Sequence, residues 1–477
     1  MTQEPHVAAV VTDTSPDELT SAISAPSQPN NAKKGGRRRA FKIGAALLDQ
    51  ALFAGSNFVV NWLILLWLPK EEAGAVVVAF TWFLLLQTFY EALTVSPMSY
   101  YGAGKYSGEF RRYLAYIFFG HAGLALLVVI GLGAGAFLVG NGAQPGDSSA
   151  MLSAALAGAA LASPFLLIRG LIRQPFYILS IPQWSAIGGA IYLITNILVT
   201  FLLYVTGNLT PFTALAGMGA AALITSIVQI GVLRPEFRKR KPESMVNSRE
   251  VIADHWRQGK WSLSARGLSW VSTNSGYLLL PLVVGFSGSA ALRASMNLVM
   301  PIFQANSALI SLLTPTFVRI YNKEGKAGLN RRVWKISRMA ALLTGVYFLF
   351  LTVFGETIIH LLYAGKYDAD ISVLFMMGIG ILPVITTTSR ILDSALVAMG
   401  RVKNSFQSKI IPTILTVVLD VLFVAAFGTI GIILESLITA FVTQAGLQMF
   451  YRRYDKNKAA KKSESSSEST PAEALTS

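Results

Sequence analysis

Apolar residues dominate twelve stretches of the chain, and each is about as long as the ~20 residues that a helix needs to cross a bilayer. Pro164, Pro175 and Pro182 interrupt the fourth and fifth stretches. The pattern predicts an all-α polytopic membrane protein with twelve transmembrane helices, at residues 43–68, 74–96, 113–139, 151–172, 182–205, 210–233, 261–285, 290–315, 333–355, 371–398, 405–427 and 429–450.

Lys and Arg are concentrated on alternate connections between the predicted spans. Of the 40 residues, all but five lie there, and the exceptions are Lys70, Lys366, Arg266, Arg293 and Arg390. Because basic connections stay on the cytoplasmic side, we expect a multi-pass inner (plasma) membrane protein with both termini cytoplasmic. The outer loops are very short, for example residues 206–209, which leaves no room for an external catalytic domain.

The composition argues against an ordinary soluble protein. Charged residues make up 14% of the chain, against about 25% in soluble domains, and the mean hydropathy is +0.52. The net charge of +15 is divided among the connections instead of forming one basic surface, so we expect membrane lipids as partners and no nucleic acid. The chain has no Cys, which excludes thiolate metal sites, and we expect neither a cofactor nor a metal.

Polar segments divide the chain into five parts. We expect a disordered cytoplasmic tail at 1–40, an N-lobe of six spans at 41–233, a cytoplasmic linker at 234–260, a C-lobe of six spans at 261–453, and a second disordered tail at 454–477. In the linker, four residues share one helical face, which fits either a short helix in the membrane interface or a solvated linker: Val251, Ile252, His255 and Trp256.

The two predicted lobes share landmarks at a nearly constant spacing. A proline, a lysine and an arginine pair recur 218 to 220 residues apart, as Pro97 and Pro315, Lys105 and Lys323, and Arg111–Arg112 and Arg331–Arg332. Six crossings return the chain to the same side, so the lobes would be parallel repeats related by a pseudo-two-fold axis along the membrane normal. The binding site is then expected between the lobes, near mid-membrane.

Polar side chains inside the spans mark the candidate site, because such residues normally face protein or a water-filled cavity. In spans one, two, seven and eight they form stripes along one helical face. The substrate-binding candidates are Asn57, Asn61, Thr273, Tyr277, Asn297, Gln304, Arg266, Arg293 and Arg390. The ion-coupling candidates are Asp49, Glu91 and Asp393, with nothing to select H⁺ over Na⁺, and spans eleven and twelve carry Asp420 and Glu435.

Several candidates also have an ordinary structural interpretation. Arg390 and Asp393 fit an ion pair along their own helix, and Asp49 is near enough to the cytoplasmic end to reach water. Arg293 fits a position at the outer rim, and Arg266 fits a contact with lipid phosphate. Taken together, a cleft with several arginines favours an anionic ligand, because a guanidinium offers phosphate a fixed fork of donors.

Six short segments resemble the polysaccharide-export (O-antigen/exopolysaccharide) flippases of the multidrug/oligosaccharidyl-lipid/polysaccharide (MOP) superfamily. They are Leu48–Phe58 in span one, Leu68–Gly74 before span two, Ser96–Met98 after it, Gly259–Trp261 before span seven, Leu292–Pro301 in span eight and Leu362–Tyr367 before span ten. The similarity covers about residues 41–453. It implies a flippase that works by alternating access and moves a polyprenyl-pyrophosphate-linked oligosaccharide to the outer leaflet for cell-surface polysaccharide biosynthesis.

Our central sequence-based hypothesis is that Arg266 contacts the pyrophosphate. The chain has no P-loop motif, so we expect a transporter and not an enzyme. The resemblance further implies a monomer that works beside a polysaccharide polymerase and chain-length machinery. One alternative is a multidrug or cation antiporter of the same superfamily, against which the intramembrane arginines argue. Another is a membrane polysaccharide polymerase or glycosyltransferase, which would need a larger outer loop.

Overall fold

The computed structural model describes residues 32–238 and 247–467, and every element in these ranges is helical. Of the predicted tails, residues 1–31 and 468–477 lie outside the described residues; the first described helix begins at Ala32 and the last continues to Ser467. The elements are α2 (Ala32–Trp67), α3 (Lys70–Tyr90), the π-helix η1 (Glu91–Val95), α4 (Ser96–Ala103), α5 (Phe110–Gly140), α6 (Ser148–Ile178), α7 (Gln183–Val205), α8 (Pro211–Arg238), α9 (Ser248–Val283), α10 (Phe286–Tyr363), α11 (Val373–Ala398), α12 (Val402–Phe427) and α13 (Thr429–Ser467).

Ten of the described helices are long and apolar enough to cross a membrane, so the chain is a multi-pass membrane protein. Helix α9, which contains predicted span seven, is not among the ten because its polar stripe lowers its hydropathy. Helix α10 is 78 residues long and is broken at Gly325, where φ is 65° and ψ is −164°. Glycine tolerates positive φ without strain, so the chain changes direction there and α10 consists of two helical segments.

Two prolines at predicted span ends lie inside continuous helical stretches instead. Pro97 follows the π-helical turn η1, and the helix continues beyond it as α4. Because proline clashes with the carbonyl four residues earlier, the wider π turn just before it can accommodate the ring. Pro175 lies within α6. Consequently Arg169 and Arg173, which the charge pattern assigned to a cytoplasmic connection, belong to a long helix.

In the predicted linker, residues 234–238 end α8 and residues 248–260 form the first turns of α9, so the segment with the predicted apolar face continues directly into predicted span seven. Val251 is buried in a cluster with residues of α4 and α5. His255 forms a 2.8 Å hydrogen bond with the Tyr113 hydroxyl, and Asp254 accepts a 2.6 Å bond from Lys105. The other two members of the predicted apolar face are exposed. This end of α9 is therefore docked on α4 and α5.

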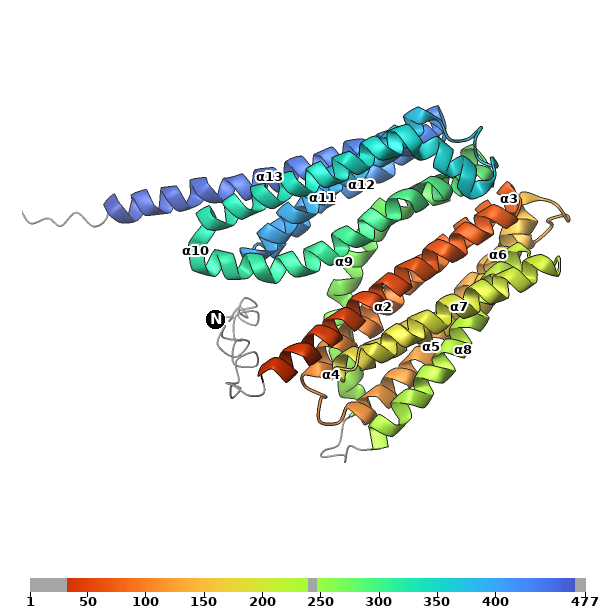
Figure 1. The fold of residues 1–477 in the computed structure, drawn as a ribbon, viewed down its shortest axis with the longest axis horizontal. Coiled ribbons are helices and arrows are strands. Elements are labelled where there is room, and N and C mark those ends of the chain that lie inside the picture. The colour runs from red at the N-terminus through yellow and green to blue at the C-terminus, as the bar shows by residue number, and fades with distance from the viewer. Residues whose placement is uncertain (1–31, 239–246, 468–477) are drawn as a thin grey trace, which may run out of the picture.

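The helices form two groups, which we call the first group (α2–α8) and the second group (α9–α13). Figure 1 shows that α10–α13 lie close to the first group at one end and diverge from it toward the end where α2 begins. Helix α9 crosses between the groups, since its start is docked on α4 and α5. We call the diverging end the basic end, because its connections carry most of the Lys and Arg residues. The end where the groups meet is called the opposite end.

Polar contacts join the two groups at the opposite end. Lys70, at the start of α3, forms a 2.5 Å ion pair with Asp370 in the loop between α10 and α11. From the same loop, Lys366 donates a 2.8 Å hydrogen bond to the carbonyl oxygen of Leu65 in α2. The loop thus binds the end of α2 and the start of α3, which belong to the other group.

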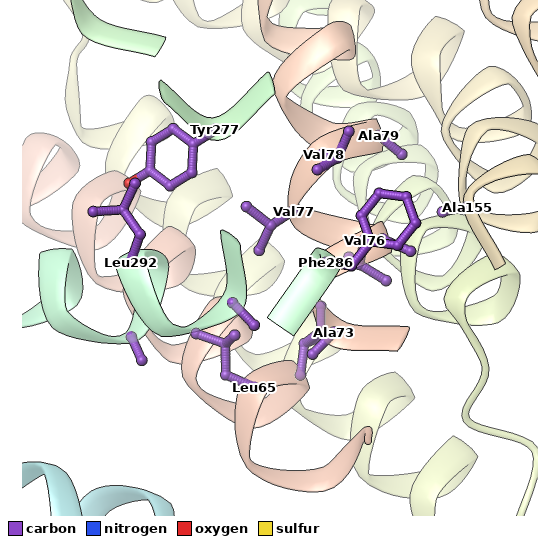
Figure 2. Close-up of a cluster of buried hydrophobic side chains, with 14 of the residues drawn as sticks. Leu65, Ala73, Val76, Val77, Val78, Ala79, Ala155, Tyr277, Phe286 and Leu292 are labelled. Carbon is purple, nitrogen blue, oxygen red and sulfur yellow. The ribbon is translucent and has the colours of Figure 1, made fainter. Parts of the chain in front are cut away.

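Apolar packing reinforces this junction. Figure 2 shows Phe286, at the start of α10, lying against the face of α3 that carries Val76 and Ala79. The two backbones touch, since a Cβ added to Gly74 would lie only 1.9 Å from the carbonyl oxygen of Phe286. A glycine in α3 is therefore a geometric requirement of the closed opposite end.

Candidate functional site

A cavity of about 610 Å³ lies between the two groups and is lined by residues of both. The first group contributes residues of α2, α3, η1, α6, α7 and α8, and the second contributes α9 and α10. Its polar and charged lining residues are Asn57, Gln87, Thr88, Glu91, Arg169, Tyr192, Trp270, Asn274, Arg293, Asn297 and Gln304. Its volume falls in the usual range of ligand pockets.

Arg169 brings a buried positive charge to the wall formed by the first group. Its side chain is 5% exposed, and its guanidinium lies 3.5 Å from the centroid of the Tyr192 ring and 5.4 Å from that of Phe53. Such cation–π contacts compensate part of the lost hydration. Helix α6 is held in place by close packing on α8, where Gly219 lies against Ala162.

Asp49 lies behind this wall and is fully buried. Arg173 donates a 2.7 Å hydrogen bond to its Oδ2 atom, and the Tyr177 hydroxyl donates to the same oxygen. The interpretation that Asp49 reaches water is therefore wrong. One carboxylate faces two arginines, Arg169 and Arg173, on the same side of α6, so the cluster carries a net positive charge.

Arg293 supplies the positive charge of the second group. It lines the cavity from α10, next to the Tyr277 hydroxyl, and its Nε atom has no hydrogen-bond partner among the described atoms. One turn further, Asn297 donates a 3.1 Å bond to Tyr363, and Gln304 lines the cavity beyond it. Arg293 therefore points into the protein and does not reach an outer rim.

Glu91 lines the cavity at the first residue of the π-helix η1. Gln87 donates to one of its oxygens at 2.9 Å, and Arg266 of α9 donates to the other at 3.1 Å. Arg266 also donates a 3.1 Å bond to Ser96 and is not among the cavity-lining residues. Arg266, which the sequence predicted to contact the pyrophosphate, thus neutralises Glu91 and links the two groups.

Four further candidates are not among the cavity-lining residues. Asn61 and Thr273 hydrogen-bond to carbonyls of their own helices, and Tyr277 is buried beside Arg293. Arg390 donates a 3.1 Å bond to Ser307.

Asp393 also lies apart from the cavity and binds across to α12. Its two oxygens accept bonds from Ser405 and, at 2.7 Å, from Lys409. The interpretation of Arg390 and Asp393 as an intrahelical ion pair is therefore wrong.

A pair of acidic residues lies deep in the second group. Asp420 of α12 and Glu435 of α13 are 1% and 3% exposed, and each has one oxygen without a hydrogen-bond partner among the described atoms. Ser275 donates to the other oxygen of Asp420. No Lys or Arg among the described residues forms an ion pair with either carboxylate. This sets them apart from Asp49, Glu91 and Asp393, which all have cationic partners.

The sequence reasoning missed Arg169, Arg173 and the cavity-lining amides Gln87 and Asn274. A signal was present, because Arg169, Arg173 and Tyr177 recur every four residues and so share one helical face. The prolines on either side concealed it, because they suggested that the helix ended before Arg173.

Comparison with known proteins identifies the fold. No protein-family model and no curated protein matches the chain. Among solved structures, the inward-facing conformation of a multidrug resistance MATE family transporter of the MOP superfamily matches with a TM-score of 0.69 at 15% identity, covering 86% of this chain and 99% of that one. The outward-facing conformation of a MATE family transporter matches with a TM-score of 0.59 at 14% identity, covering 86% and 96%.

The lipid II flippase MurJ, in an inward closed conformation, matches with a TM-score of 0.65 at 14% identity, covering 87% of each chain. The chain therefore has the fold of the MATE and MurJ transporters of the MOP superfamily. This agrees with the kind of fold that the resemblance implied, and at these identities the similarity shows the fold alone.

Proposed function

We propose that this protein is a flippase that translocates a polyprenyl-pyrophosphate-linked oligosaccharide across the bacterial inner membrane for cell-surface polysaccharide biosynthesis. The observation that carries the proposal is that Arg169 and Arg293, from opposite helix groups, line one cavity. Guanidinium groups bind phosphate oxygens through paired hydrogen bonds. Glu91 is the one acidic residue among the lining residues, and it is already paired with Arg266, so the cavity favours an anion.

The uncharged lining fits the sugar part of such a substrate. Asn57, Gln87, Asn274, Asn297 and Gln304 offer amide donors and acceptors around the cavity. Side-chain amides can both donate to and accept from hydroxyl groups, which suits a carbohydrate. The polyprenyl chain can remain in the lipid while the pyrophosphate and adjoining sugars occupy the cavity.

The proposed architecture has twelve spans in two six-helix lobes related by a pseudo-two-fold axis along the membrane normal. It counts α9 and both segments of α10 as spans. By the positive-inside rule the basic end is cytoplasmic. The chain would then be in an inward-facing state, and its greater similarity to the inward-facing than to the outward-facing MATE structure supports this. In the transport cycle, the contacts at the opposite end would open as the basic end closes.

Asp420 and Glu435 are the proposed ion-coupling pair. A buried carboxylate without a cationic partner is costly unless it binds a proton or a metal cation. The sequence-based candidates Asp49, Glu91 and Asp393 already have cationic partners, so they remain secondary candidates.

A cation antiporter is the competing function. The cavity wall carries Phe53, Phe58, Phe80, Phe83 and Trp270, which suit a flat aromatic cation. The fold similarity to MATE transporters also allows it. The two lining arginines oppose it, because they would repel a cationic drug.

The test is complementation of polysaccharide export in a host strain that lacks its own copy. Arg293→Gln and Arg169→Lys should reduce export strongly at unchanged protein abundance. The control Arg390→Gln, outside the cavity, should leave export near the wild-type level. Arg266→Ala should also impair export, because it leaves the charge of Glu91 facing the anion. Normal export from the first two variants would contradict the proposal, and resistance to cationic drugs without any export would favour the antiporter.

A further inference from the structure

A second cavity, of about 590 Å³, lies between α5 and α8, away from the site between the groups. It is lined by two arginines and five apolar residues: Arg111, Arg234, Leu114, Ala115, Phe118, Ile230 and Leu233. Both helices have their basic-end termini here, since α5 begins at Phe110 and α8 ends at Arg238. We call this cavity the α5–α8 groove.

The charges and the apolar walls of the groove are separated along the membrane normal. Arg111 lies two residues before predicted span 113–139, and Arg234 lies one residue after predicted span 210–233. Both arginines are therefore at the level where hydrocarbon gives way to headgroups. Phe118 and Ile230 lie one to two turns further into the bilayer.

Neither arginine is neutralised within the described part of the chain. Both side chains are exposed, and no ion pair or hydrogen bond joins them to a described acidic residue. Two uncompensated guanidinium groups that line the same groove repel each other, so an anion between them is favourable. Basic pockets between transmembrane helices are suited to anionic lipid headgroups.

We infer that the α5–α8 groove binds one anionic phospholipid, with its phosphate between Arg111 and Arg234 and an acyl chain against Phe118 and Ile230. A free phosphate ion would use the arginines but not the apolar walls. A zwitterionic lipid would use the walls but would bring its own positive charge close to the arginines. The inference is independent of what the central cavity transports.

Binding is measured on the purified full-length protein by native mass spectrometry and by thermal shift, with phosphatidylglycerol, phosphatidylcholine or inorganic phosphate added. Phosphatidylglycerol should bind and stabilise the protein more than phosphatidylcholine does. The Arg111→Gln/Arg234→Gln variant should bind phosphatidylglycerol at least about tenfold more weakly. The matched control Arg331→Gln/Arg332→Gln, an exposed pair on α10, should retain wild-type binding.

A second variant tests the contribution of the groove's shape to lipid binding apart from that of its charge. Ala115→Trp keeps both arginines and fills the space between the walls, so it should also weaken binding of phosphatidylglycerol. If binding survives both the double Gln variant and Ala115→Trp, the inference is overturned. It is likewise overturned if inorganic phosphate competes fully with the lipid, because the groove would then be a free-anion site, or if the control pair loses as much binding.

Discussion

Gly74→Ala tests whether the contact between α3 and α10 holds the opposite end closed. A Cβ at position 74 would lie 1.9 Å from the carbonyl oxygen of Phe286 and 2.4 Å from its carbonyl carbon. Ordinary contact begins at 3.4 Å, so the two backbones must separate by the difference, 1.5 Å. Because the obstructing atoms are backbone, no side-chain rotation can relieve the clash.

The expected cost falls on the closed conformation alone, since Gly74 and Phe286 belong to different helix groups. Overpacking of this kind costs about 1–3 kcal/mol. If the open conformation escapes that cost, its population relative to the closed one should rise by a factor of about 5–150. The direction is toward the conformation that is open at the opposite end.

The absence of native Cys makes the measurement simple. Spin labels at Gln144→Cys and Ala369→Cys, on exposed connections of the two groups, report the separation at the opposite end by double electron–electron resonance. Gly74→Ala should add or enlarge a long-distance population. The control Gly120→Ala, whose added Cβ would meet no atom within 4 Å, should not. An unchanged distribution in a folded Gly74→Ala protein, or an equal shift in the control, would refute the reasoning.

Three further perturbations test other parts of the structure. Burial, together with the charge of Lys70, lowers the pKa of Lys366 from 10.5 to about 8 in the closed conformation. If opening exposes Lys366 to water, Lys366 binds its proton more tightly in the open conformation than in the closed one. Raising the pH from 8 toward 10 should therefore increase the closed population in the same spin-label experiment. Lys366→Gln should remove this pH dependence. Asp49→Asn leaves Arg173 without its partner and should lower the free energy of unfolding, measured by denaturation in detergent, by about 3–5 kcal/mol. Adding Arg173→Gln should restore part of the lost stability. An unchanged stability of the Asp49→Asn variant would argue against a structural ion pair. Glu435→Gln should abolish the dependence of transport on pH or Na⁺ in a vesicle assay, and an unaltered dependence would exclude Glu435 from coupling.

Local patterns predicted most of the helices correctly. The spans at 182–205 and 113–139 agree with α7 and α5 to within a few residues. Two of the errors came at Pro97 and Pro175, where the chain continues as a helix. A proline disfavours a helix locally, but neighbouring helices and a π-helical turn can satisfy the freed backbone groups. Nothing in the local pattern reveals that compensation.

The candidate site was predicted in part. Of the three arginines selected from the sequence, Arg293 lines the cavity, whereas Arg266 pairs with Glu91 and Arg390 hydrogen-bonds to Ser307. Arg169 was missed, although it is buried in the cavity wall. Counting the basic residues on each connection cannot distinguish an arginine at the end of a helix from one that lies two turns inside it. Both kinds of arginine follow the same apolar run in the sequence.

The sequence alone determined that the chain is helical and crosses a membrane many times, because burial in lipid requires long apolar runs whose backbone bonds are satisfied within each helix. It also determined which helical faces are polar, since the helical repeat follows directly from residue spacing. Only the tertiary structure decided which polar residues neutralise one another and which remain available to a ligand. That depends on contacts between residues far apart in the chain, such as Arg173 with Asp49 and Arg266 with Glu91. Such pairs form only once the helices pack, so no pattern along a single helix can specify them.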